Sequence, residues 1–271
     1  MTSQTTSPTA VPRRWLAFSA ALAAMLMELL DATVSSNAGP AIRANLGGSY
    51  ADLQWIGAGY TLALTVGLLT GGRLGDLLGR KQMLLIGVAG FTIASLACTV
   101  APSMEFLIAA RVAQGAVGAI MVPQVFGLIR DLFPPAEMGK AFTVLGPCAG
   151  LTAVVGPILA GLIIDANVFS TDWRLVFGIN VPVGIFAFVV GARNLPAVAP
   201  VSVSRRLDLA GTALAAAGTS MLVYPLVQGR EQGWPVWSIA LLIASVPVLA
   251  VFGWLQTTRR RAGKTTLIEP S

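Results

Sequence analysis

The sequence contains no histidine, only two cysteines and few charged residues. Charged residues make up 11% of the 271 residues, less than half of the roughly 25% that is typical of soluble domains. Without histidine, the commonest proton shuttle and metal ligand is absent, so any proton chemistry must use carboxylates. The low charge and the 55% share of hydrophobic residues exclude a soluble enzyme. A membrane enzyme is disfavoured as well, because the sequence has no metal cluster, nucleophile–base pair or cofactor loop.

Long apolar runs are what the sequence has in abundance. A helix that spans a bilayer needs roughly 20 predominantly apolar residues. Eight stretches meet this requirement: 16–38, 53–74, 82–101, 106–128, 141–164, 174–192, 208–227 and 236–255. We therefore predict an all-α membrane protein with eight spans that contacts the lipid bilayer. Cys98 and Cys148 fall in these spans at depths about 14 Å apart, so we expect free thiols rather than a disulfide.

The distribution of basic residues predicts the orientation in the membrane. Most of the 18 Lys and Arg residues flank the spans on the side of the N-terminus. Arg43, Arg174 and Arg230 lie on the other side, and Arg111 lies within a span. Because basic residues accumulate on the cytoplasmic side, we expect both termini to be cytoplasmic and the chain to lie in the cell membrane. This bias accounts for the net charge of +6, so no nucleic acid partner is expected.

Two carboxylates stand in the middle of the first span, where a charge is costly. Glu28 and Asp31 lie on one helical stripe with Ser35. Burial disfavours an ionised carboxyl group, and a neighbouring carboxylate disfavours it further. One interpretation is a water-filled cavity in which the two groups share a proton. The alternative is a helix interface at which a protonated Glu only donates a hydrogen bond.

A cation lies five residues into the fourth span. Arg111 shares a stripe with Gln114, Gly115 and Gly118, which is the pattern of a cavity-facing group that bonds a carboxylate, a water molecule or a substrate. The alternative is that Arg111 extends to the nearby membrane surface, as long basic side chains often do.

Two further segments have glycine at helical or turn spacing. The segment 72–81 is expected to form a tight cytoplasmic turn with Asp76 near the start of the third span, where a helix dipole favours an anion. The fifth span is dense in small residues, and Gly156-Pro157 is expected to kink it. Ordinary turn formation and plain close packing remain the alternatives for these two segments.

Five motifs in order along the chain resemble the major facilitator superfamily, and most closely its fourteen-helix drug:proton antiporter branch. The first-span motif appears as Leu30, Asp31, Thr33, Ala38 and Pro40, and the motif after the second span as Gly72, Leu74, Gly75, Asp76, Gly79, Arg80 and Lys81. The fourth-span motif appears as Leu107, Arg111, Gln114 and Gly115, and the fifth-span antiporter signature as Gly156, Pro157, Ala160 and Gly161. The fifth motif consists of Trp173-Arg174 followed by Asn180-Val181-Pro182.

The resemblance implies a secondary transporter that exports small amphipathic or drug-like compounds, with antibiotic resistance as its consequence. It uses no cofactor and draws its energy from a proton gradient. Proton coupling would involve Asp31 and Arg111, to which the stripe geometry adds Glu28. The remaining implied residues fall into three groups. Ser35, Gln114, Gly115, Trp55 and Tyr60 would line the substrate cavity; Gly72, Gly75, Asp76, Gly79, Arg80 and Lys81 would form a gating loop; and Gly150, Gly156, Pro157 and Gly161 would form the antiporter helix.

The resemblance also implies a division of the chain. We expect a disordered cytoplasmic tail (1–14), a six-helix N-terminal bundle built as a 3+3 inverted repeat (15–195), two additional linker helices (196–255) and a cytoplasmic basic tail (256–271) that marks a truncation point. A second bundle would normally follow, because substrate sites in such transporters lie between repeats near the membrane midplane. The alternative function is therefore a non-transporting fragment, or a subunit of a split transporter that needs a second six-helix polypeptide.

Overall fold

The computed structural model describes residues 14–167, 171–197, 209–229 and 232–261. These residues form α-helices joined by short connections. The helices are α1 (Arg14–Asn37), α2 (Gly39–Leu46), α3 (Tyr50–Leu78), α4 (Arg80–Thr99), α5 (Met104–Leu132), α6 (Met138–Ala166), α7 (Leu175–Gly178), α8 (Asn180–Asn194), α9 (Leu209–Gln228) and α10 (Val236–Arg261). Two short 3-10 turns, Pro135–Glu137 and Asp172–Arg174, precede α6 and α7.

The helices confirm the predicted fold class. Seven candidate spans of the described chain are long and apolar enough to cross a membrane. The remaining predicted span, 53–74, corresponds to α3. This helix bends by 47° between Tyr50–Leu68 and Thr70–Leu78 and counts as a span if its two parts are taken together. Every predicted span thus has its helix in the structure. Cys98 and Cys148 are free, as predicted.

The short helix α2 was not predicted, because residues 39–52 lie between the first two apolar runs. The structure places Pro40 in the first turn of α2, where a proline costs no hydrogen bond. Gly47 and Gly48 then adopt φ values of 76° and 97°, a left-handed backbone that turns the chain into α3. Ser49 and Asp52 close the start of α3 with a capping box.

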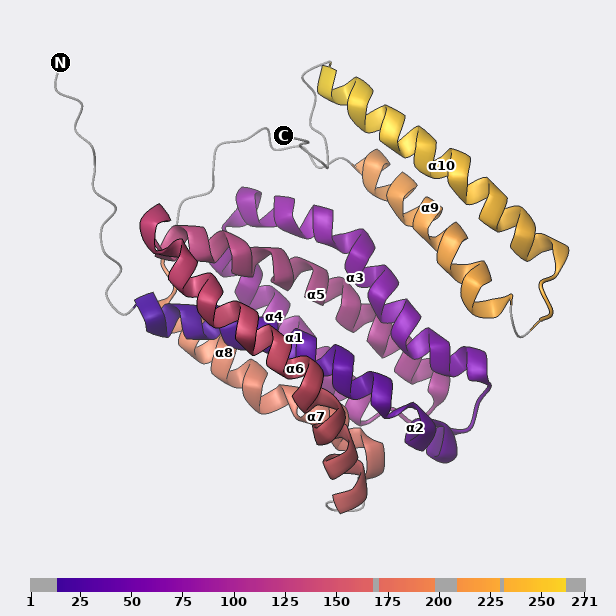
Figure 1. The fold of residues 1–271 in the computed structure, drawn as a ribbon, viewed down its shortest axis with the longest axis horizontal. Coiled ribbons are helices and arrows are strands. Elements are labelled where there is room, and N and C mark those ends of the chain that lie inside the picture. The colour runs from indigo at the N-terminus through magenta and orange to yellow at the C-terminus, as the bar shows by residue number, and fades with distance from the viewer. Residues whose placement is uncertain (1–13, 168–170, 198–208, 230–231, 262–271) are drawn as a thin grey trace.

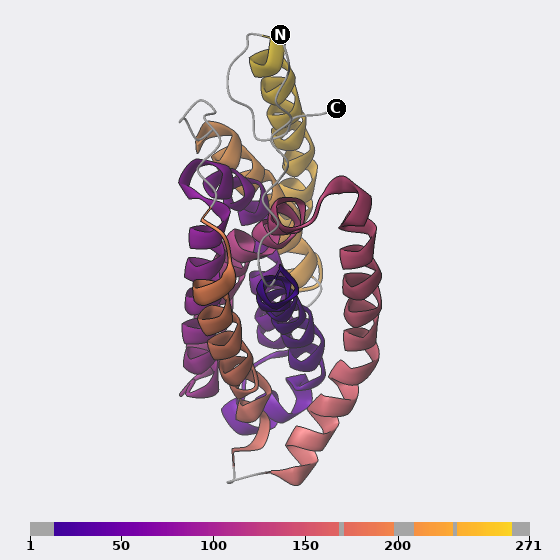
Figure 2. The same ribbon diagram turned by 90° about the vertical axis from the view of Figure 1, so that its left-hand side faces the viewer.

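The helices α1, α3, α4, α5 and α8 pack into a bundle (Figure 1). The helix α6 packs against α1 and lies along one side of the bundle (Figure 2). The helices α9 and α10 pair with each other, and α9 packs against α3. Two hydrogen bonds join α9 to α3: Trp55 Nε1 donates to Gln228 at 3.2 Å, and the hydroxyls of Thr70 and Thr212 are 3.1 Å apart.

Two apolar clusters fill the interior of the bundle. One contains Phe18, Leu84 and Leu128 near the start of α1, and the other contains Val34 and Trp173 near its end. Polar side chains that are almost fully buried lie between the two clusters: Asp31, Ser95, Arg111, Gln114 and Asn180. The bundle therefore has a polar layer in its centre, at the level where a membrane is least tolerant of charge.

Some predicted boundaries differ from the structure. Arg14 belongs to α1 and pairs with Glu137 at 2.5 Å, and residues 256–261 continue α10. Both had been predicted as tails, because basic residues ended the apolar pattern; helices often extend a turn beyond their apolar part. The rest of the tails, 1–13 and 262–271, lies outside the described residues. The wider division at 195 and the inverted repeat stay predictions.

Candidate functional site

The polar layer is centred on an ion pair between α1 and α5. Arg111 Nη1 donates to Asp31 Oδ2 at 2.5 Å, and the two side chains are 1% and 0% exposed. The guanidinium group also donates to the Ile56 carbonyl oxygen and to Ser35 Oγ, both at 3.3 Å. Arg111 therefore points into the bundle, and the alternative that it extends to the membrane surface is wrong.

Amide groups from two other positions complete the surroundings of Asp31. Gln114 Nε2 and Asn180 Nδ2 donate to Asp31 Oδ1 at 3.0 and 2.6 Å. The same two amides donate to Ser95 Oγ at 2.8 and 3.2 Å. Gln114 Oε1 accepts from Arg111 at 2.6 Å, which fixes the direction in which the Gln114 amide points. Asp31 is thus held by donors from α5 and α8.

This arrangement corrects the expectation that Asp31 faces a water-filled cavity. The Asp31 side chain is enclosed by Arg111, Gln114 and Asn180, and none of its surface is exposed. A carboxylate inside a low-dielectric bundle is tolerated because a cation and two amides replace the water it has lost. The ion pair reaches a cavity only through Arg111 and its partner Ser35.

Glu28 has a partner of its own. Tyr60 Oη donates to Glu28 Oε1 at 3.1 Å, and Glu28 keeps 7% of its surface exposed. The Tyr60 ring packs against the Arg111 guanidinium group, with 4.0 Å between Cζ and the ring centroid, a favourable cation–π geometry. Glu28 and Asp31 are therefore bonded to different groups, and the interpretation that they share one proton stays a prediction.

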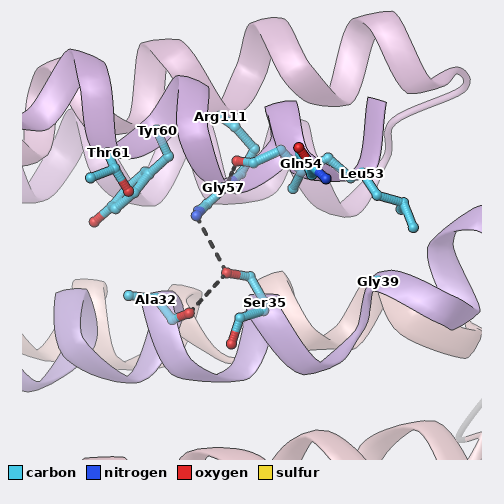
Figure 3. A pocket seen from close by; sticks show the side chains of 11 residues that line it. Ala32, Ser35, Gly39, Leu53, Gln54, Gly57, Tyr60, Thr61 and Arg111 are labelled. Carbon is cyan, nitrogen blue, oxygen red and sulfur yellow. Dashed lines mark hydrogen bonds between the residues drawn. The ribbon is translucent and has the colours of Figure 1, made fainter. Parts of the chain in front are cut away.

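A cavity of about 330 Å³ opens beside this cluster, between α1 and α3. Figure 3 shows that Arg111 and Ser35, which both line it, are joined by a hydrogen bond. Its polar lining residues are Ser35, Ser36, Gln54, Tyr60, Thr61 and Arg111, and its apolar ones are Ala32, Gly39, Leu53, Ile56 and Gly57. The cavity thus joins an apolar wall to a few hydroxyl and amide groups and one compensated cation, as small-molecule sites commonly do.

Three residues predicted to line the cavity lie elsewhere. Gln114 is fully buried beneath the ion pair. Gly115 packs against α3, where an added Cβ would overlap the Tyr60 carbonyl oxygen. Trp55 faces α9 instead, with its ring 5.6 Å from that of Tyr224. Ser35 and Tyr60 do line the cavity.

The predicted gating loop is mostly helical. The helix α3 continues to Leu78, so Gly72, Gly75 and Asp76 lie in its last turns, and only Gly79, with φ 98°, forms the turn. Directly after this turn, Arg80 bridges two carboxylates: it donates to Asp76 at 3.1 Å and to Asp131 at 2.8 Å. The turn is tighter than expected because glycine adopts this backbone without strain.

The other gating residues connect neighbouring elements. Lys81 Nζ donates to the Leu195 carbonyl oxygen at 2.7 Å. An added Cβ at Gly75 would overlap the Gln124 amide, so this glycine lets α3 and α5 approach closely. A Cβ added at Gly72 would lie at ordinary contact distance from the Pro123 side chain. The gating role of these residues stays a prediction.

The small residues of α6 divide into two groups. Gly156 contacts α1, where an added Cβ would overlap the Thr33 side chain, and Pro157 follows it inside the helix. Gly150 and Gly161 have no atom within 4 Å of such a Cβ. Of these three glycines of α6, only Gly156 therefore supports close helix packing, and the antiporter role of α6 stays a prediction.

Two residues that bind the ionic groups were not predicted from the sequence as site residues. Asn180 was noted only as part of a motif, and Asp131 was not noted. The one available signal was a polar or charged residue within or next to an apolar run, which does not identify its partner. In the part of the chain that the structure describes, no three His, Cys, Asp or Glu side chains gather to hold a metal ion.

The sequence of the chain is similar to those of known transporters. The chain is 49% identical over 264 residues to a probable actinorhodin transporter of Streptomyces coelicolor, covering 97% of this chain and 46% of the relative. It is 36% identical over 241 residues to a tetracenomycin C resistance and export protein of Streptomyces glaucescens, covering 89% of this chain and 44% of the relative. The chain thus spans about half the length of the curated relatives it matches. These names are those of transporters, which confirms the prediction that the chain is not an enzyme.

The fold also has counterparts among solved structures. A crystal structure of the POT family transporter PepTSo matches with a TM-score of 0.60 and 15% identity, covering 92% of this chain and 55% of the other. At this identity the likeness concerns the fold alone. Residues 20–268 match the family model described as Major Facilitator Superfamily. The resemblance predicted from the motifs is confirmed: the chain belongs to the major facilitator superfamily.

Proposed function

We propose that this chain provides the N-terminal bundle of a secondary transporter that exports small amphipathic or drug-like compounds in exchange for protons. The observation that carries the proposal is the ionic cluster of Asp31, Arg111 and Glu28, which borders the cavity between α1 and α3. Ionisable groups inside a membrane bundle are costly and are typical of ion and substrate pathways. The proton gradient, rather than a cofactor, supplies the energy.

The relatives support the direction of transport and the class of cargo. Two of them are named for an antibiotic that they transport or export. The cavity volume of about 330 Å³ lies at the lower end of the range typical of small-molecule sites. We propose that the cell membrane holds the chain with both termini in the cytoplasm, and that a second bundle completes the cargo site. The apolar side chains Leu151, Val154, Ile158 and Leu162 of α6 are all more than half exposed and offer a surface for lipid or for that bundle.

The test is efflux of the dye ethidium from vesicles that contain the chain together with a second six-helix bundle and carry an imposed pH gradient. We expect efflux that stops when a protonophore collapses the gradient and is lost in Asp31→Asn, because this change leaves Arg111 buried without its counter-ion. The matched control is Asp165→Asn, which makes the same chemical change at an exposed position in the last turn of α6. Equal gradient-driven efflux by Asp31→Asn and wild type would refute the coupling role of the cluster.

The alternative, a non-transporting fragment, gives a different result. In that case vesicles that contain the chain together with the second bundle show no gradient-driven efflux.

A further inference from the structure

The two carboxylates of α1 differ in the kind of partner they have. All three polar groups bonded to Asp31 are obligate donors: the Arg111 guanidinium group and the amide nitrogens of Gln114 and Asn180. The Gln114 amide cannot simply turn around, because its oxygen already accepts from Arg111. A proton added to Asp31 would point at a donor and would have to break at least one of these bonds. The hydrogen bonds of Asp31 therefore leave no acceptor in place for a proton on its carboxyl group.

The partner of Glu28 is different. A hydroxyl group both donates and accepts hydrogen bonds. The Tyr60 hydroxyl donates to an ionised Glu28 in the observed arrangement, and by rotating it accepts from a protonated one. The hydrogen bond thus persists in both protonation states of Glu28, with its direction reversed.

With both carboxylates ionised, the cluster of Glu28, Asp31 and Arg111 contains one negative charge more than it contains positive charges. The titratable and charged side chains that act on it are Asp31 on its own helix, Tyr60 on α3 and Arg111 on α5. Arg111 is already paired with Asp31. The charged residues of α6 and α8, which also pack against α1, are in the end turns of those helices: Lys140, Asp165 and Arg193. A proton on Glu28 would therefore neutralise the cluster.

We propose that Glu28, rather than Asp31, is the carboxyl group that binds and releases the proton, and that the Tyr60 hydroxyl transmits this change to the cargo cavity. This inference rests on the proposed function. A hydronium ion gives its proton to a Glu28 oxygen and becomes water; the hydrogen bond from Tyr60 O–H to Glu28 is replaced by one from Glu28 O–H to the Tyr60 oxygen. Because Tyr60 lines the cavity, its hydroxyl hydrogen then becomes available to an acceptor on the cargo. Asp31 and Arg111 act as a fixed support, and the Tyr60 ring stays against Arg111.

Isotope labelling tests the assignment without any substitution. Wild-type chain labelled with ¹³C at the side-chain carboxyl of either glutamate or aspartate is placed in lipid nanodiscs, and infrared difference spectra are recorded as the pH is lowered. We expect the high-frequency C=O band of a carboxyl group in apolar surroundings to move with the glutamate label and not with the aspartate label. A band that moves with the aspartate label, or the absence of any such band, would overturn the proposal.

Two variants assign the band to one residue. It should disappear in Glu28→Gln, whose amide still accepts from Tyr60, and persist in Glu105→Gln, which changes an exposed glutamate in the first turn of α5. If the band survives in Glu28→Gln, Glu28 is not the proton site. The spectra do not depend on transport: a glutamate band without ethidium efflux would refute the proposed function alone, and efflux without that band would refute the present inference alone.

The role of Tyr60 as a positioning residue has its own readout. Tyr60→Phe keeps the ring against Arg111 and removes only the hydroxyl. We expect the Glu28 band to remain while ethidium efflux loses its dependence on the pH gradient. Efflux that stays coupled to the gradient in Tyr60→Phe would show that the proton signal does not pass through this hydroxyl.

Discussion

Two arginine–carboxylate clusters of the described residues, those of Arg111 and Arg80, have similar distances and different surroundings. In the polar layer, Arg111 and Asp31 are 1% and 0% exposed. At the turn between α3 and α4, Arg80 is 21% exposed, and its partners Asp76 and Asp131 are 44% and 16% exposed. Water and salt reach the second cluster but not the first. Removal of one ionic partner is therefore expected to lower the free energy of unfolding strongly in the first cluster and only weakly in the second.

The largest effect is expected when the buried pair is broken on one side. Arg111→Met should lower the free energy of unfolding by roughly 3–5 kcal/mol, because it leaves Asp31 buried with two amide donors and no cation. Chemical unfolding in detergent micelles, followed by circular dichroism, measures this loss. The double variant Asp31→Asn with Arg111→Met removes both charges and should recover most of the stability. A loss below about 1 kcal/mol in the single variant would remove the contrast between the clusters.

The next effect concerns the close approach that holds Arg111 near α3. Gly115→Ala should lower the free energy of unfolding by about 1–3 kcal/mol, because the new methyl group overlaps the Tyr60 backbone and forces the helices apart. The control is Gly150→Ala on α6, where an added Cβ meets no atom within 4 Å. The same unfolding experiment applies, and equal stabilities of the two variants would contradict the role of Gly115.

A smaller effect is expected at the exposed cluster. Asp131→Asn should lower the free energy of unfolding by at most about 1 kcal/mol, and molar salt should reduce the difference from wild type, because the Debye length falls to about 3 Å at 1 M. A salt series of unfolding curves measures this, with Asp31→Asn as the salt-insensitive comparison. If both variants respond equally to salt, the clusters do not differ in solvent access.

The smallest effect concerns the attachment of α9 to α3. Thr70→Val removes the hydroxyl contact with Thr212 and should lower the free energy of unfolding by about 0.6 kcal/mol, the average for hydrogen bonds between membrane helices. Thr143→Val is the control, since the Thr143 hydroxyl bonds only the Gly139 carbonyl of its own helix. A loss as large as that of Arg111→Met would mean that α9 stabilises the bundle far more than its polar contacts suggest.

Sequence alone predicted the spans well and the site in part. The length of apolar runs determines which segments become membrane helices, so each predicted span has its helix. Helical periodicity correctly placed Glu28, Asp31 and Ser35 on one side of α1. It could not show that Asp31 would be enclosed by Arg111, Gln114 and Asn180, because that depends on which helices become neighbours. The same limit explains why Asp131 was missed and why Trp55 faces α9 rather than the cavity.

Asn180 connects a peripheral helix to this centre. It begins α8, which contributes no residue to the lining of the cavity, yet its amide donates the 2.6 Å bond to Asp31. A displacement of α8 that carried Asn180 outward would remove one of the three hydrogen-bond donors of Asp31. Arg111 and Gln114 would then be the remaining donors. The hydrogen bonding of the central ion pair therefore depends on the position of α8.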